Sequence, residues 1–203
     1  MALYERYLLP RLLDIACGTD AVMQTRAQVV PLASGRVLEI GIGTGLNLSL
    51  YDPAQVTAIV GVDPAAQAQQ LARKRAARIG IPLQTIALEL GQIQAADASF
   101  DSIVCTFTLC TIPDAGAALT EMRRVLKPGG KLLFSEHGLA PDLPVVRWQN
   151  RLTPIWKSLV GGCHLNRDIA ALISAGGFTI RQLQSSYLQG PKALTWVSRG
   201  WAD

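Results

Sequence analysis

A glycine-rich segment carries the residues best suited to binding a ligand. Glu39 is followed by Gly41, Gly43 and Gly45 at every second position. The segment comes directly after an apolar run typical of a β-strand, and glycines let the backbone turn tightly and approach a ligand closely. A dinucleotide site needs the spacing G-x-G-x-x-G, but here the third glycine comes one residue early and Leu46 stands in its place. The spacing therefore favours a smaller nucleoside ligand over a pyrophosphate.

A second acidic residue, Asp63, ends the next apolar run and is followed by Pro64. A carboxylate at the end of a parallel strand can accept hydrogen bonds from both hydroxyls of a ribose. The ribose of NAD would be held in the same way, so Asp63 alone does not specify the ligand. Asp63 could also cap the helix expected after Pro64, and that role is compatible with ribose binding.

The chain has two histidines, His137 and His164. We expect His137 at the carboxyl end of a strand and His164 in a segment that caps this edge, where open α/β sheets bind their ligands. Both are candidates for moving a proton during a reaction, with a structural role as the alternative. Glu136 precedes His137 and could orient a histidine, bind a cofactor amino group or cap a helix.

The elements that position these residues follow from alternating short apolar and longer amphipathic runs, which indicate βαβ units. We predict an α/β fold with a seven-stranded, mostly parallel sheet, helices on both faces and an antiparallel last strand. A further helix should begin near Leu46, after the glycines. The other helices are expected at 3–17, 20–32, 65–79, 115–126 and 168–175, and the strands at 36–40, 56–62, 83–88, 100–106, 131–136, 178–185 and 193–201.

Composition limits the class of protein. The chain has 203 residues, of which 49% are hydrophobic and 17% charged, as expected for one globular domain over residues 1–203. The net charge of +4 is scattered, without the basic and aromatic pattern of a nucleic-acid groove. The four cysteines form no C-x-x-C pair, so we predict no metal site and a reducing, cytoplasmic location. We find no apolar run long enough to span a membrane.

Four segments, read in order, resemble the class I S-adenosylmethionine-dependent methyltransferases: residues 39–45, 62–64, 99–101 and 124–130. The resemblance implies a Rossmann-like sheet with an N-terminal helical lid, and S-adenosylmethionine as cofactor with S-adenosylhomocysteine as product. It places the glycines under the methionine part, Asp63 at the ribose and Glu89 at the adenine, although the family's proline after this acid is absent. The cofactor-binding set that it implies is Glu39, Gly41, Gly43, Gly45, Asn47, Asp63, Pro64, Glu89, Leu90 and Thr106.

The second half of the chain is similar to a narrower group. Residues 104–112, 135–138, 147–150, 154–156 and 161–168 resemble the small methyltransferases related to the animal methyltransferase-like 7 thiol S-methyltransferases. This resemblance implies a small thiol acceptor, with Cys110 facing it and residues 139–166 forming an insertion that caps the acceptor. The animal proteins have an N-terminal membrane anchor. The N-terminal helices, residues 1–34, could make weak peripheral contact with a membrane, and Tyr4 and Tyr7 could contribute to the lid.

Several functions remain open at this point. The first is methyl transfer to a small thiol, with His137, His164 and Cys110 as the catalytic candidates. A methyltransferase acting on a phospholipid amine or a quinone precursor is the second, and a module that binds S-adenosylmethionine without turnover is the third. The glycine spacing disfavours an NAD-dependent dehydrogenase. Neither the acceptor nor the oligomeric state follows from the sequence.

Overall fold

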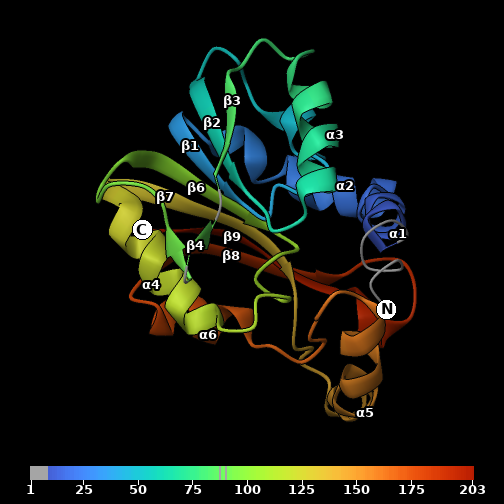
Figure 1. Ribbon diagram of the computed structural model, residues 1–203. Coiled ribbons are helices and arrows are strands. Elements are labelled where there is room, and N and C mark those ends of the chain that lie inside the picture. Colours follow the sequence, from blue (N-terminus) through green and yellow to red (C-terminus); the bar gives the residue numbers. More distant parts are fainter. Residues whose placement is uncertain (1–8, 87, 90) are drawn as a thin grey trace.

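The computed structural model describes residues 9–86, 88, 89 and 91–203 (Figure 1). Over these residues, seven strands form one sheet in the order β3-β2-β1-β6-β7-β9-β8. The strands from β3 to β7 pair in parallel, and β9 is antiparallel to both β7 and β8. This arrangement confirms the predicted sheet. The strands are β1 Gly35–Ile40, β2 Val56–Val62, β3 Leu83–Ile86, β6 Phe100–Thr106, β7 Leu126–His137, β8 Ile180–Tyr187 and β9 Trp196–Ala202.

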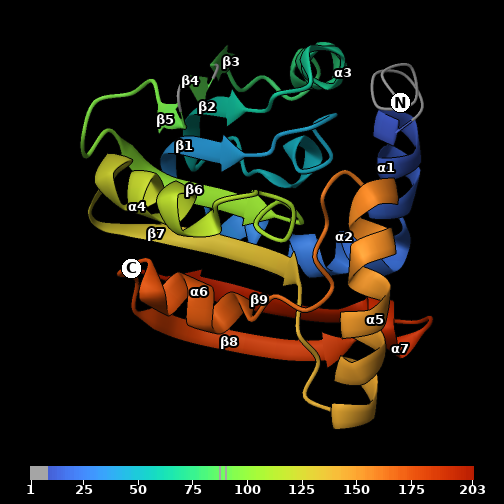
Figure 2. The ribbon, with the colours of Figure 1, turned by 60° about the horizontal axis from the view of Figure 1, so that its bottom comes forward.

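Helices cover both faces of the sheet and its carboxyl edge. In Figure 1, α4 and α6 lie on one face and α3 on the other. Figure 2 shows α1, α2 and α5 standing across the edge to which β1, β6 and β7 point. The helices are α1 Leu9–Cys17, α2 Asp20–Ala27, α3 Ala66–Ala76, α4 Ala115–Val125, α5 Leu143–Leu159, α6 Ile169–Ala175 and α7 Lys192–Thr195.

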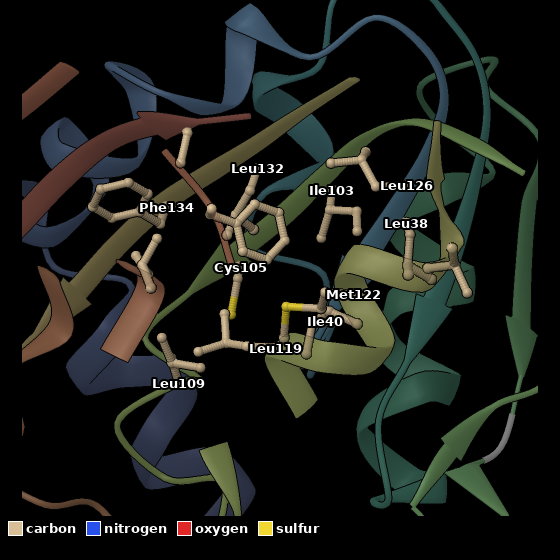
Figure 3. Close-up of a cluster of buried hydrophobic side chains, with 14 of the residues drawn as sticks. Leu38, Ile40, Ile103, Cys105, Leu109, Leu119, Met122, Leu126, Leu132 and Phe134 are labelled. Atoms are coloured by element: carbon tan, nitrogen blue, oxygen red, sulfur yellow. The ribbon is translucent and has the colours of Figure 1, made fainter. Parts of the chain in front are cut away.

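The core has two parts, one on each face of the sheet, because successive side chains of a strand point to opposite sides. Leu38 of β1 belongs to the cluster under α4 and α6, which Figure 3 shows with Leu119 and Phe134. Its neighbour Val37 belongs to the cluster under α3. Burial on both faces fixes the sheet and holds the carboxyl ends of its central strands in place.

The connection between β1 and β2 differs from the prediction. An α-helix was expected from Leu46, but the segment contains only a 3₁₀ turn, Leu48–Leu50. Asn47 and Tyr51, on either side of this turn, direct their side chains to the buried carboxylate of Glu39. Those contacts replace the regular turn of an α-helix. The residues after the glycines are therefore bonded to Glu39 rather than arranged in a crossover helix.

Other predicted bounds also need correction. The helix expected at 20–32 ends at Ala27, and a separate 3₁₀ turn, Val30–Leu32, contains Pro31, which has no N–H to continue an α-helix. The strand expected at 83–88 ends at Ile86. Leu88–Glu89 (β4) instead pairs with Gln92–Ile93 (β5) in a small antiparallel sheet, turning at Gly91, whose φ is +80°.

At the later strands, the differences follow local backbone features. β7 begins at Leu126 rather than at 131, because Leu126 pairs with Phe100 before an irregularity in the ladder. β9 begins at Trp196 rather than at 193, because Pro191 precedes the short helix α7. Tyr4, Tyr7 and Leu90 lie outside the described residues.

No helix in the described part of the chain combines the length and the apolar character needed to cross a membrane.

Candidate active site

The glycine turn follows β1 and leaves one glycine open to a ligand. Gly41, Gly43 and Gly45 all have positive φ, between +52° and +83°, which glycine adopts without strain. A Cβ added at Gly41 would lie 2.2 Å from the Thr108 hydroxyl oxygen, and one at Gly45 would lie 2.5 Å from the Leu48 side chain. At Gly43 the nearest atoms would be 3.8 and 4.0 Å away. Gly41 and Gly45 therefore serve packing, whereas Gly43 presents open backbone.

Asp63 is bonded directly to this turn. One carboxylate oxygen accepts the N–H of Gly43 at 2.9 Å and the other accepts the N–H of Ala65 at 2.8 Å. Burial raises the pKa of Asp63, and the two backbone hydrogen bonds partly offset this. The N-cap of α3 is Ala65 rather than Asp63, so the capping role considered for Asp63 is not the one observed. Pro64 lies between them, next to the turn.

Three of the predicted cofactor residues form one buried network. The Glu39 carboxylate accepts hydrogen bonds from the Asn47 amide at 2.9 Å and from the Tyr51 hydroxyl at 2.8 Å. Asn47 also donates to the Thr106 hydroxyl at 2.9 Å. Burial raises the pKa of Glu39 to about 7, although the bonds from Tyr51 and Asn47 act in the opposite direction. Tyr51 was not foreseen from the sequence.

Arg26 of α2 completes this network and was also missed. Arg26 is 5% exposed, and its guanidinium donates to the Asn47 side-chain oxygen at 2.9 Å and to the Thr106 hydroxyl. The same group lies 4.9 Å from the centre of the Phe107 ring. Its Nε has no hydrogen-bond partner among the described residues. A buried cation with an unused donor is costly unless an anion completes it. Arg26 could not be found from the sequence, because a single arginine in a helix before the first strand belongs to no motif.

The first helix, α1, is bonded to residues at the same carboxyl edge of the sheet. Asp14 of α1 forms an ion pair with Arg75 of α3 at 3.0 Å and accepts a hydrogen bond from the Thr44 hydroxyl. Burial would raise the pKa of Asp14, but the bonds from Arg75 and Thr44 outweigh it and hold that pKa below its usual value. Arg75 also donates to the Thr44 carbonyl at 2.9 Å. Thus α1 and α2 both contact the loop that carries the glycines, where the lid was predicted.

Glu89, the residue predicted to bind adenine, lies in β4 rather than at the end of a strand of the main sheet. Its side chain and all of Leu90 fall outside the described residues. Their contact with the adenine stays a prediction.

A second group of polar side chains lies at the ends of β6 and β7. His137 is the last residue of β7 and is 6% exposed, and neither ring nitrogen has a hydrogen-bond partner among the described residues. The backbone N–H of His164 donates to the carbonyl oxygen of Cys110 at 2.9 Å, and its ring Nδ1 lies 3.2 Å from the same oxygen. The three predicted catalytic residues thus lie on adjoining segments.

Cys163 connects these residues. Its Sγ lies 3.8 Å from the Sγ of Cys110. The pKa of Cys163 is lowered to about 5, because the hydrogen bond with Cys110 and the neighbouring His137 imidazole together outweigh the effect of burial. This lowered pKa favours the thiolate form of Cys163 over that of the other cysteines in the described part of the chain. The sequence placed it in a recognisable segment, but no spacing showed that it would meet Cys110.

Glu136 does not orient a histidine. Its buried carboxylate accepts the backbone N–H groups of Thr108, Leu109 and Cys110, at 2.9 to 3.2 Å. The carboxylate thereby fixes the turn that presents Cys110. Cys105 is packed in the core, and its thiol lies 3.5 Å from the Glu136 carboxylate.

The two tryptophans of the insertion behave differently. Trp156 of α5 contacts Cys163 and contributes to its lowered pKa. Trp148, on the same helix, is 57% exposed and does not cover a pocket.

Comparisons with known proteins agree with this geometry. Residues 38–134 match the model of a methyltransferase domain. The chain is 34% identical to the thiol S-methyltransferase TMT1B of Homo sapiens, over 83% of the chain and 69% of that protein. It is 36% identical to TMT1B of Rattus norvegicus, over 81% of the chain and 66% of that protein. The chain thus spans about two thirds of the length of these relatives.

Other relatives of this chain are methyltransferases with different acceptors. The chain is 31% identical to the phosphatidylethanolamine N-methyltransferase of Cereibacter sphaeroides, over 66% of each protein. Among solved structures, a methyltransferase from Thermotoga maritima is similar with a TM-score of 0.64 and 21% identity, over 98% of this chain and 97% of that one. This likeness shows the fold. The chain therefore belongs to the class I S-adenosylmethionine-dependent methyltransferases and is close to the thiol S-methyltransferase type.

Proposed function

We propose that this protein transfers the methyl group of S-adenosylmethionine to the sulfur of a small thiol. The observation that carries the proposal is the His137 imidazole at the carboxyl end of β7. This ring is buried, has no hydrogen-bond partner among the described residues and lies beside the Cys163 sulfur. The thiol S-methyltransferases to which the chain is similar support the choice of acceptor. The insertion, residues 139–166, would cap the acceptor, since it carries α5 and Cys163.

The residues on the cofactor side fit S-adenosylmethionine by charge. Glu39 supplies a carboxylate for the ammonium group of the methionyl part, and Asp63 supplies one for the ribose hydroxyls. Arg26 supplies a buried guanidinium with an unused Nε, suited to the methionyl carboxylate. Gly43 leaves its backbone open beside Asp63. We propose the remaining predicted contacts, including Glu89 and Leu90 at the adenine, on the family resemblance alone.

On the acceptor side, residues of this chain would remove one proton, that of the acceptor thiol. When bound, S-adenosylmethionine supplies a methyl group on a positively charged sulfur that is open to in-line displacement. His137 accepts the proton of the incoming thiol at a free ring nitrogen, because the thiolate is the nucleophilic form. The Cys163 thiolate stabilises the resulting imidazolium. His164 is bonded to the Cys110 carbonyl through Nδ1 and so positions the Cys110 turn.

The test is release of S-adenosylhomocysteine with small thiols, quinols and phosphatidylethanolamine vesicles offered separately. We expect turnover with thiols, and loss of turnover in His137→Ala with unchanged cofactor affinity. Turnover confined to vesicles or quinols would overturn the thiol assignment. Cofactor binding without turnover on any acceptor would instead support a binding module.

Small molecules are the partners of the methyltransferases that resemble this chain, and a small acceptor is proposed here. Weak membrane contact through the N-terminal helices is a further proposal. Ile15 of α1 is largely exposed, as an apolar residue that meets lipid should be. Co-sedimentation with anionic vesicles should fall in Ile15→Glu, and equal sedimentation of both proteins would contradict the contact.

A further inference from the structure

We propose that Cys110 and Cys163 are a site of reversible disulfide formation by peroxides, and that this bond switches off the acceptor side. The effect on turnover rests on the proposed function, whereas formation of the bond does not. The two thiols come from separate segments, the turn after β6 and the loop after α5, and their sulfur atoms lie 3.8 Å apart. A disulfide requires about 2 Å between sulfur atoms. A small movement of the side chains therefore suffices.

The backbones of the two cysteines are already held side by side. The Cys110 N–H is bonded to Glu136 at 3.2 Å, and its carbonyl accepts the N–H of His164, the residue after Cys163. The Cys163 N–H donates to the Val160 carbonyl at 3.1 Å. The bond between His164 and Cys110 joins the two backbones, and the other two bonds fix each cysteine in its own segment. Bridging them does not require either segment to unfold.

The two thiols also differ in exposure and in pKa, and a stepwise oxidation requires both differences. Cys163, at 9% exposed, is the more accessible of the pair, and its thiolate form is favoured by Cys110 and His137. Cys110 is buried, and its hydrogen bond with Cys163 and its burial both hold its pKa well above the usual value. A thiolate attacks a peroxide, and a neighbouring thiol then resolves the product.

The reaction balances with one peroxide. The Cys163 sulfur attacks a peroxide oxygen, an S–O bond forms, the O–O bond breaks, and hydroxide leaves and is protonated to water. The Cys110 sulfur then attacks the sulfenic acid, an S–S bond forms, the S–O bond breaks, and the Cys110 proton leaves with the hydroxyl as water. The peroxide is reduced by two electrons and the pair of thiols is oxidised by two.

The other two cysteines, which the structure also describes, are poor competitors. Cys105 is buried in the core, where burial and the Glu136 carboxylate raise its pKa well above the usual value. Cys17 of α1 has its pKa raised by burial, in spite of the nearby Arg26. Cys163 is near enough to Cys17 for its charge to help raise the Cys17 pKa, which makes Cys17 the informative control.

The disulfide would remove the negative charge beside His137. In the proposed mechanism, that charge stabilises the imidazolium formed when His137 takes the acceptor proton. A positioned general base contributes about 10²- to 10⁴-fold, and the disulfide weakens this base without removing it, so turnover should fall by at least about tenfold. Cofactor contacts at Asp63 and Glu39 do not involve either cysteine, so cofactor affinity should be retained.

The experiment treats the full chain with hydrogen peroxide, blocks free thiols with iodoacetamide and maps the peptides by mass. We expect titratable thiols to fall from four to two, a peptide pair joined through Cys110 and Cys163, and full reversal by dithiothreitol. In Cys110→Ser, Cys163 should stop at a sulfenic acid that dimedone traps. Cys17→Ser should form the bond as the parent chain does. Circular dichroism checks that each variant is folded.

Three outcomes would overturn the proposal: four free thiols after peroxide, a bond that joins Cys163 to Cys17, or turnover unchanged in the bridged protein. If the reduced protein methylates no thiol, the proposed function fails. The peptide map then still decides whether the disulfide site exists.

Discussion

At the scale of single residues, Asp63 accepts the N–H of Gly43 in the glycine turn with one carboxylate oxygen and the N–H of Ala65, at the start of α3, with the other. Replacement by Ala would remove a structural tie as well as a ligand, so Asp63→Asn is the sharper variant. A hydrogen bond to a charged group contributes about 1.5–3 kcal/mol, and we expect affinity for S-adenosylhomocysteine to fall about 10- to 100-fold. Calorimetry measures the affinity and thermal unfolding checks the fold. Unchanged affinity would place the ribose elsewhere.

Arg26 allows a test that separates the two halves of the cofactor. Arg26→Met removes the cation that we assign to the methionyl carboxylate. S-Adenosylhomocysteine should bind at least about tenfold more weakly, whereas methylthioadenosine, which lacks that carboxylate, should bind as before. Arg26→Lys keeps the charge and should restore part of the difference. Equal weakening of both ligands would show that Arg26 only supports the fold.

At the scale of elements, Gly41 and Gly43 in the turn after β1 have different roles. Gly41→Ala places a methyl group against Thr108 and forces a φ near +69°, and we expect about 3 kcal/mol of destabilisation. Gly43→Ala meets open space, so we expect only the strain, about 1 kcal/mol, together with loss of cofactor binding. Urea unfolding and calorimetry distinguish these effects. A Gly43→Ala protein that binds normally would contradict an open ligand-facing position.

The sequence predicts the elements better than it predicts contacts between them. The apolar runs of β2 and β6 predict both strands residue for residue, because burial on both faces leaves a continuous signal. The bonds of Asn47 and Tyr51 to Glu39 depend on a 3₁₀ turn that periodicity does not reveal. Arg26 reaches Thr106 across 80 positions of sequence, and Cys163 reaches Cys110 across 53. Contacts of that range depend on the packing of the lid and the insertion against the sheet.

At the scale of the whole molecule, the buried carboxyl of Glu39 makes stability depend on pH. Its pKa is about 7 in the folded protein, against the usual 4.5. Between these values the folded chain holds a proton that the unfolded chain has lost, so this contribution to stability falls as pH rises, by about 3 kcal/mol in total. The Cys163 thiol, with a pKa lowered to about 5, acts in the opposite direction at higher pH.

The contribution of Glu39 is therefore measured as a difference. Glu39→Gln stays uncharged at every pH, and the unfolding free energy of the parent chain minus that of the variant should decline from pH 4.5 to pH 7. Urea titrations across this range provide the values. A constant difference would mean that Glu39 has an ordinary pKa in the folded protein.

The position of β9 in the sheet has a consequence for how the molecule is made. β9 comes last along the chain, yet it lies between β7 and β8 and pairs with Glu136 and His137 on its β7 side. During synthesis, the edge of β7 stays unpaired until the ribosome has released residues 196–202. Until then β8 has no strand to pair with, because its neighbour in the sheet is β9. Nascent chains that stall in this interval expose a strand edge able to pair with other chains. The part of the sheet that holds Glu136 and His137 is therefore the last to be completed.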